Sequence, residues 1–324
     1  MVLVATGMGL VGLDDRGTEL FRALTDHELS RLYVDPEGRI LTIADQRAIL
    51  CAPATDQADR DGAWERLGSL PEDTQANCLA ELGGRLWIGA ADARLWVMPA
   101  EGGAPRRLRS FDDVETRESW DTPWGGPPDV RSISVIAGDR PAIYADIHVG
   151  GIVRSFDLGE SWSQAAGSLH RDVHRVNVHR RRPNRVYAAT ARGCFISEDR
   201  GETWSQHLEP FEPRQYQRCV MPDFADPDHF LCAVSLGPHP EGETGCEAMI
   251  YRTEDGGASW EAAHQGLPEY FYHNINTHML SASVQRPGVF AFHDDEEAVY
   301  LTEDGARSWR RIAGVDDARA VLAI

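Results

Sequence analysis

One short motif recurs four times in the second half of the chain, with the pattern S/T-x-D-x-G-x-S/T-W. The first copy consists of Ser155, Asp157, Gly159, Ser161 and Trp162. The aspartates of the four copies are Asp157, Asp199, Asp255 and Asp304. Only the last copy departs from the pattern, with Ala306 in place of glycine. Each copy follows a run rich in β-branched and aromatic residues, so the motif predicts a β-hairpin that is repeated along the chain.

The residue types of the motif have local structural roles. The aspartate can accept hydrogen bonds from backbone N–H groups inside a tight turn, and glycine can adopt the positive φ that such a turn requires. The Ser or Thr hydroxyl can hold the strand ends together, and the Trp side chain can bury a large apolar area beside the turn. These roles predict that the four aspartates are structural and not catalytic.

The four motif copies resemble the Asp-box (BNR) repeats of sialidases, sortilin-like receptors and photosystem II assembly factors, which implies a β-propeller fold and no particular activity. The segments WDTPWGGPPDVRS, IHVGGIVRS, DVHRV and GLPEYFYHNINTH also resemble a bacterial group of WD40/YVTN/BNR-like repeat proteins, often labelled glycosyl hydrolases or sialidases. This second resemblance covers most of residues 105 to 312 and implies no catalytic assignment. The chain contains no Arg-Ile-Pro segment, so classical sialidase chemistry is not expected.

The spacing of the repeats predicts the number of blades. The motif aspartates recur about every 49 residues, so a chain of 324 residues holds six or seven repeats of four strands each. The N-terminal segment supplies only three strands, and the last segment, Ala318 to Ile324, supplies one. Pairing of these two segments would close the ring and remove exposed strand edges. We therefore expect an all-β, seven-bladed β-propeller that forms a single domain over residues 1–324.

Charge and composition exclude several classes of partner. The net charge is −19, which opposes binding to nucleic acid and to anionic membranes. No apolar run of 18 residues is present, and the N-terminal segment lacks the basic start of a signal peptide. The six cysteines contain no CxxC pair, as is typical of buried free thiols. Together these features predict a cytoplasmic protein that binds neither nucleic acid nor membrane and whose ligand is a small molecule.

The long connections between predicted strands indicate where a site would lie, because loops on a rigid scaffold often carry function. The longest are Asp112 to Asp129, Leu236 to Ala248, the segment PEYFYHNINT and the IHVGG turn. In a propeller, the connections between blades and those between the second and third strands of a blade share one face. All four segments belong to these two kinds, so the sequence predicts a site on that face.

A polar residue precedes the first inward apolar residue of each innermost strand by two positions. These residues are Ser30, Asn77, Arg131, His174, Arg218, His278 and Arg319. Since strand side chains alternate with period two, we expect them to form a ring at the channel mouth. Arg131, Arg218 and Arg319 would then bind an anionic ligand such as a carboxylate or phosphate. The alternative is a water-filled channel lined by hydrated polar groups.

Three histidines are the predicted reactive groups of this site. His148, His174 and His278 can together form a divalent metal site, because neutral imidazoles bind Zn, Cu, Fe or Ni. His148 or His174 can instead act as a general acid or base.

Four further residues complete the predicted site. Trp120 and Trp124 would form an apolar wall over the ligand, or alternatively pin the long loop to the blades. Asp121 and Asp146 would orient an imidazole, or alternatively cap turns.

Three functions of different classes are compatible with these features. The first is an enzyme or enzyme-like binder that acts on a small anionic or polar molecule at the channel mouth. The second is a non-catalytic interaction or assembly scaffold, which would expose an apolar patch. The third is binding or hydrolysis of glycosides, which would need two carboxylates facing one sugar. The sequence does not single out such a pair.

Overall fold

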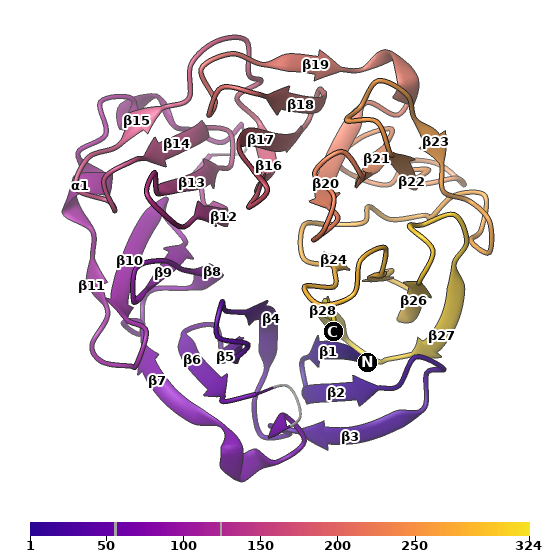
Figure 1. Cartoon of the computed structure of the whole chain (residues 1–324), viewed down its shortest axis with the longest axis horizontal. Coiled ribbons are helices and arrows are strands. Elements are labelled where there is room, and N and C mark those ends of the chain that lie inside the picture. Colours follow the sequence, from indigo (N-terminus) through magenta and orange to yellow (C-terminus); the bar gives the residue numbers. More distant parts are fainter. Residues whose placement is uncertain (55–56, 124) are drawn as a thin grey trace.

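The computed structural model describes residues 1–54, 57–123 and 125–324. The strands form seven antiparallel sheets of four strands, arranged as blades around a central axis (Figure 1). This confirms the all-β, seven-bladed propeller. The blade that contains both chain ends consists of β28 (Ala318–Ala323), β1 (Val2–Thr6), β2 (Gly9–Leu13) and β3 (Glu19–Ala23).

The other six blades each use four consecutive strands, which follow one another from the axis outward. The second blade consists of β4 (Leu29–Val34), β5 (Ile40–Ala44), β6 (Ala48–Ala52) and β7 (Glu65–Ser69). The third consists of β8 (Ala76–Glu81), β9 (Arg85–Ala90), β10 (Arg94–Pro99) and β11 (Arg106–Arg107). The fourth consists of β12 (Val130–Ile136), β13 (Ala142–Ile147), β14 (Gly151–Ser155) and β15 (Ser163–Gln164).

The last three blades contain the remaining copies of the motif. The fifth consists of β16 (Val173–His179), β17 (Arg182–Thr190), β18 (Gly193–Ser197) and β19 (Ser205–His207). The sixth consists of β20 (Tyr216–Pro222), β21 (Phe230–Ser235), β22 (Met249–Thr253) and β23 (Glu261–Ala262). The seventh consists of β24 (Leu280–Ala282), β25 (Phe290–His293), β26 (Ala298–Thr302) and β27 (Arg310–Gly314).

Closure of the ring occurs as the sequence predicts. The C-terminal strand β28 pairs antiparallel with β1, in a register that joins Val2 to Ala323 and Ala5 to Ala320. The backbone N–H of Ile324 also donates to the carbonyl of Met1 at 2.9 Å. Each blade therefore has four strands, and the edge that β1 would otherwise expose is paired.

Helical structure is confined to single turns among the described residues. Helix α1 (Arg109–Asp112) replaces the end of the outer strand that was expected to continue from β11. Single 3₁₀ turns occur at Asp61–Ala63, Arg117–Ser119 and Glu209–Phe211. The segment that begins at Asp26 forms a hydrogen-bonded turn that leads into β4. In the described part of the chain, no helix has the length and apolar character needed to cross a membrane.

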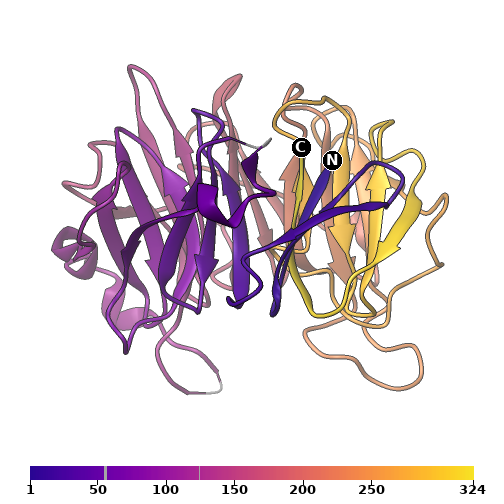
Figure 2. The same cartoon turned by 90° about the horizontal axis from the view of Figure 1, so that it is seen from below.

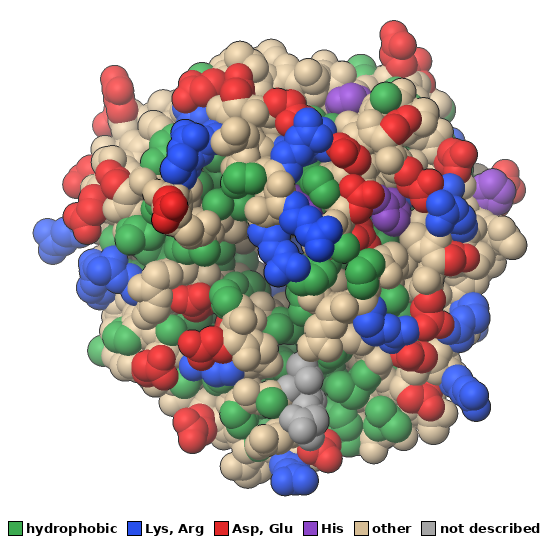
Figure 3. Space-filling model, in the orientation of Figure 1, with side chains coloured by type: hydrophobic (Ala, Val, Ile, Leu, Met, Phe, Trp, Pro, Cys, Tyr) green, Lys and Arg blue, Asp and Glu red, His purple; other side chains and the backbone are tan. Residues whose placement is uncertain are grey.

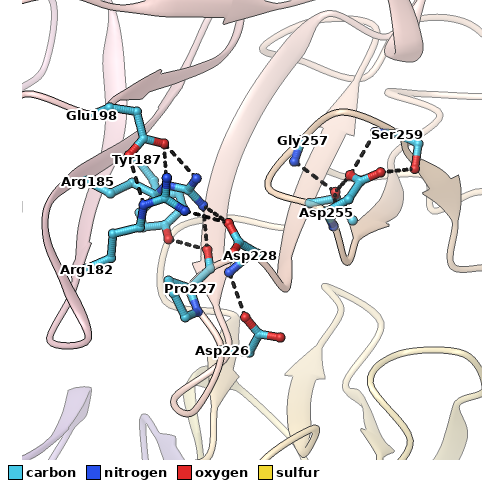
Figure 4. Close-up of polar contacts among 11 residues, drawn as sticks. Arg182, Arg185, Tyr187, Glu198, Asp226, Pro227, Asp228, Asp255, Gly257 and Ser259 are labelled. Carbon is cyan, nitrogen blue, oxygen red and sulfur yellow. Dashed lines mark hydrogen bonds and ion pairs between the residues drawn. The ribbon is translucent and has the colours of Figure 1, made fainter.

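The four motif copies form tight turns, which we call the box turns (residues 155–162, 197–204, 253–260 and 302–309). In the third, the Asp255 carboxylate accepts the backbone N–H of Ser259 at 2.8 Å and its hydroxyl at 2.6 Å (Figure 4). The Thr253 hydroxyl donates to Asp255 Oδ1 at 2.8 Å and accepts the N–H of Gly257 at 3.0 Å. The ring of Trp260 packs edge-on against Phe211 and Phe230, so each predicted local role is present.

The core lies between neighbouring blades. Apolar side chains from facing blades form separate clusters around the ring, such as the one in which Val176 and Phe195 contact Tyr144 and Ile152 of the preceding blade. All six cysteines are buried free thiols, as predicted.

The innermost strands contain β-bulges that the sequence did not reveal. In six blades one extra residue of the innermost strand interrupts the pairing near its N-terminal end. The extra residue falls at Ser30, at Asn77, within the pair Arg131 and Ser132, at His174, at Arg218 and at Arg319. A bulge breaks the period-two alternation, so the facing inferred from alternation is wrong at these positions. The polar residues identified in the sequence are therefore the residues at which the bulges occur.

Candidate functional site

The long connections lie together on one face of the propeller. In Figure 2, the magenta loop between β11 and β12 and an orange loop between β21 and β24 project from the edge opposite the chain termini. The N–H of His148 donates to the carbonyl of Asp129 at 2.9 Å, and the N–H of Gly151 donates to that of Arg171 at 2.7 Å. The side chain of Asn274 donates to the carbonyl of Gly237 at 3.0 Å. These contacts join segments that are distant in sequence, so the predicted convergence on one face is present.

His174 lies at the centre of this face, on the bulge of β16, and its side chain is fully buried. Its Nδ1 is 2.5 Å from the carbonyl oxygen of Gln217. Its Nε2 is 3.2 Å from the Tyr216 hydroxyl and 3.2 Å from Asp172 Oδ1. A carbonyl oxygen can only accept, so Nδ1 carries the proton and Nε2 presents a lone pair.

His148 and Asp172 complete a three-residue group with His174. The Nε2 atom of His148 is 3.7 Å from Asp172 Oδ1, and its ring centroid is 5.9 Å from that of His174. One potential ligand atom from each of the three residues lies within 4.8 Å of the other two. Asp172 was not among the predicted site residues. Its position, two residues before His174 in a connection between blades, was the available signal.

The protonation states of the group follow from burial and from nearby arginines. Burial, followed by the positive charge of Arg131, lowers the pKa of His148 to about 3. Burial also lowers the pKa of His174, against the opposing influence of Asp172. Burial alone would raise the pKa of Asp172, but its contacts with His174 and His148 lower it overall. At neutral pH the group therefore contains two neutral imidazoles and one carboxylate.

Arg131 and Arg218 place positive charge beside the group. The Nη1 atom of Arg131 and the Nε atom of Arg218 are buried and have no hydrogen-bond partner among the described residues. Within that part of the chain, neither side chain forms an ion pair with a carboxylate. Arg218 instead lies over the ring of Tyr216, with 5.1 Å between its Cζ and the ring centroid, and burial lowers its pKa.

Some buried arginines elsewhere in the molecule are paired with carboxylates. Arg185 contacts Glu198 and Asp228, both at 2.6 Å (Figure 4). The face that carries the termini has arginine side chains near its middle and acidic side chains spread around it (Figure 3). Since the chain contains no lysine, all 32 basic side chains are arginines. Among the described residues, Arg131 and Arg218 therefore differ from Arg185 in forming no ion pair with a carboxylate. We call Arg131, His148, Asp172, His174, Tyr216 and Arg218 the mouth cluster.

His278 is not part of the three-residue group. It precedes β24 and is buried among arginines, where burial, followed by the charges of Arg31 and Arg175, holds its pKa well below the usual value. Both arginines donate to backbone carbonyls: Arg31 Nε to Asn77 at 2.6 Å and Arg175 Nη1 to Leu280 at 3.3 Å. This second positive region adjoins the position of Arg131, whose backbone and charge also influence His278.

The other predicted site residues lie outside the mouth cluster. Arg319 is paired with Asp317 at 2.9 Å and Glu28 at 3.1 Å. Asp121 is exposed and forms an ion pair with Arg171 at 2.5 Å, which ties the long loop to the next blade connection.

Trp120 and Asp146 take structural positions. Trp120 is buried, 5.9 Å from the ring of Phe111, in the cluster that includes Ile147, so it pins the loop to the blade. The Asp146 carboxylate accepts the N–H groups of Arg131 and Ser132, which caps the bulge of β12. Trp124 lies outside the described residues.

Comparisons with known proteins support the fold. A family profile described as Sortilin, neurotensin receptor 3 (Sortilin-Vps10) matches residues 150–284, which is less than half of the chain. No curated protein matches the sequence.

Several solved structures are similar in shape. An ancestral GH74 enzyme aligns with a TM-score of 0.60 and 13% identity, over 93% of this chain and 37% of its own. The GH74 xyloglucanase from Xanthomonas campestris aligns with a TM-score of 0.58 and 15% identity, over 96% of this chain and 46% of its own. YCF48 from Cyanidioschyzon merolae aligns with a TM-score of 0.55 and 15% identity, over 93% of this chain and 87% of its own. The chain therefore spans less than half the length of the two GH74 enzymes, and it shares with all three proteins the propeller fold.

Proposed function

We propose that the protein binds a small anionic molecule at the mouth cluster, between Arg131 and Arg218 and beside His148 and His174. The observation that carries this proposal is the pair of buried guanidinium nitrogens, Arg131 Nη1 and Arg218 Nε, that have no partner among the described residues. The proposed ligand is a carboxylate or a phosphate, since the guanidinium fork matches both.

The energetic reason is desolvation. A cation that leaves water without a partner loses several kcal/mol of hydration, and a counter-charge offsets much of this cost. Asp172 cannot supply all of that charge, because it lies against the two histidines at 3.2 and 3.7 Å. A bound anion would accept hydrogen bonds from both arginines and so provide them with a counter-charge.

The neighbouring histidines are suited to proton transfer on such a ligand. Both are neutral at neutral pH because burial lowers their pKa values, and the negative charge of a bound anion would raise these pKa values toward the range in which an imidazole exchanges protons. We therefore propose an enzyme or enzyme-like binder in which the arginines anchor the charge and the histidines exchange protons.

The test is a titration by calorimetry with inorganic phosphate and with malonate. Arg218→Met and Arg131→Met keep an apolar stem but remove the charge, so we expect each to weaken the binding of the better anion at least tenfold. Arg310→Met is the matched control, since Arg310 is paired with Glu303 on an exposed outer strand at 2.7 Å, and we expect it to bind as the wild type does. Unchanged affinity in both mouth variants, or no binding of either anion, would overturn the proposal.

The other two functions are a peptide scaffold and a glycoside site. Either would appear in the same experiment as binding that does not change in Arg131→Met and Arg218→Met. A peptide scaffold is suggested by the likeness to YCF48, which has been solved bound to a D1 peptide, and a glycoside site by the likeness to the GH74 enzymes. Similarity of fold alone does not support either of these functions. The exposed large apolar side chains among the described residues come from separate strands and loops, as Met8, Leu20, Leu236 and Tyr272 illustrate.

A further inference from the structure

We infer that His148, Asp172 and His174 form a binding site for one divalent first-row metal ion, with two imidazole nitrogens and one carboxylate oxygen as ligands. This inference deepens the proposed function. It rests on that proposal for the identity of the anion that would occupy the remaining coordination positions of the ion. Binding of the ion itself can be measured without any anion.

The spacing of the donor atoms suits an ion of this size. Metal–nitrogen and metal–oxygen bonds of about 2.0–2.2 Å place neighbouring ligands of a tetrahedral or octahedral ion about 3.0–3.5 Å apart. Asp172 Oδ1 is 3.2 Å from His174 Nε2 and 3.7 Å from His148 Nε2. A small side-chain movement of His148 would bring all three atoms to ligand distance.

The hydrogen bonds of the group leave an acceptor without a donor. His174 Nδ1 donates to the carbonyl of Gln217, so Nε2 faces Asp172 Oδ1 with a lone pair. Two acceptors at 3.2 Å repel each other. The Tyr216 hydroxyl can donate to Nε2, but Asp172 Oδ1 is buried and has no hydrogen-bond partner among the described residues. A cation at this point would attract both acceptors.

The surroundings prepare the imidazoles for a metal. A ligating histidine usually donates its other ring N–H to a carbonyl or carboxylate, which fixes its orientation, and His174 has this contact with Gln217. The donor set of two histidines and one carboxylate is one that Zn²⁺ and Fe²⁺ accept.

The two arginines make metal binding depend on an anion. Arg131 and Arg218 have no carboxylate partner among the described residues and would repel a dication. An anion between the arginines would neutralise them and could also bind the ion, so each ligand should strengthen the binding of the other. Such coupling is reciprocal, and we expect malonate to tighten zinc binding several-fold, and zinc to tighten malonate binding by the same factor.

The test uses the whole chain after removal of metal with a chelator. We expect calorimetry to show one Zn²⁺ bound per chain, and Co²⁺ to give a visible absorption band typical of nitrogen and oxygen ligands. Asp172→Asn and His148→Ala should each weaken zinc binding at least tenfold. His273→Ala is the matched control, because His273 is a half-exposed histidine 3.8 Å from the Asp295 carboxylate and outside the cluster, and it should bind zinc as the wild type does.

The outcomes separate this inference from the proposed function. In metal-free protein Arg218→Met should lose malonate binding, and in the absence of malonate it should keep zinc binding, whereas Asp172→Asn should lose zinc binding. Because His174 is fully buried, its substitution can fail to fold. The test therefore depends on Asp172 and His148, whose side chains are 23% and 15% exposed. A wild-type chain that binds no Zn²⁺ or Co²⁺, or equal zinc affinity in wild type, Asp172→Asn and His148→Ala, would overturn the metal site and leave the anion site standing.

Discussion

The carboxylate of Asp255 in a box turn and that of Asp172 in the mouth cluster have opposite hydrogen-bonding environments. Asp255 accepts the hydroxyl groups of Thr253 and Ser259 and the N–H of Ser259, all within four residues of itself. Asp172 lies beside His148 and His174, which come from different blades, and its Oδ1 has no hydrogen-bond donor among the described residues.

This difference shows which acidic groups are available to a ligand. The hydroxyl and N–H of Ser259 lower the pKa of Asp255 to about 2, so this charge is already stabilised by its own turn. A group of this kind has a structural role. At Asp172 the acceptor capacity is unused and the neighbours are titratable, which is typical of a functional site.

The largest expected effect comes from deleting residues 318–324, which removes β28. A box turn closes within eight residues, but the mouth cluster draws on three neighbouring blades whose positions depend on a closed ring. We expect the truncated chain to lose cooperative thermal unfolding, followed by circular dichroism, together with anion binding. An unchanged melting temperature would mean that pairing of β28 with β1 is not needed to hold the ring.

A smaller effect is expected from Gly159→Ala in the first box turn. Gly159 has a φ of 85°, and an added Cβ would lie 2.7 Å from the buried ring of Trp87. Strain and overpacking together predict a loss of about 2–4 kcal/mol of unfolding free energy. Gly201→Ala is the matched control, because its φ is 88° but its nearest Cβ contact is 3.4 Å, so about 1 kcal/mol is expected. Equal losses in urea unfolding would show that contact with Trp87 is unimportant.

Removal of a box carboxylate should affect stability and leave the site intact. In the second box turn Asp199 accepts the N–H groups of Glu202 and Thr203 at 3.1 and 2.8 Å. We expect Asp199→Ala to lower the unfolding free energy by about 1–3 kcal/mol and to leave phosphate and malonate affinity unchanged. A large loss of affinity at unchanged stability would place this carboxylate in the functional site and break the comparison.

The smallest expected effect concerns the order in which His278 and the box-turn carboxylate of Asp255 respond to acid. The folded-state pKa of His278 is well below 6.5, so protons bind the unfolded chain first, and this stabilising contribution declines as pH falls below about 6.5. The folded-state pKa of Asp255 is also depressed, to about 2, so its contribution is complete above about pH 4 and declines as pH falls toward 2. In metal-free protein, His278→Gln should reduce the loss of stability between pH 6.5 and 5, and Asp255→Asn should not change the slope in that range. The opposite result in urea unfolding at several pH values would contradict these assignments.

Most of the fold could be predicted from the sequence because its signals are local and repeated. Seven blades and their closure could be predicted from the motif copies, the strand lengths and the incomplete set of strands at each end. The prediction was least accurate at single residues, as at Arg109, where a helical turn replaces strand. A preference of a few residues for one conformation is weak and is overruled by packing.

The candidate site was predicted in part. Arg131, His174 and Arg218 were singled out because polar residues stand at corresponding positions in several innermost strands, and His148 because it lies in the IHVGG turn on the same face. Asp172 was missed, since a carboxylate in a connection between blades has no repeat to mark it. His278 was expected beside the other histidines, but it lies among Arg31 and Arg175.

The sequence by itself determined the repeated hairpin, the number of blades, the closure of the ring and the face that carries the long connections. Each of these depends on contacts between residues close in the chain, or on a count of equivalent units. The tertiary structure decided which polar groups meet: Asp172 lies beside His148 and His174, and Arg319 pairs with Glu28. The physical reason is the β-bulge at the start of the innermost strands, because one extra residue turns side chains away from the direction that alternation predicts, and their partners come from neighbouring blades.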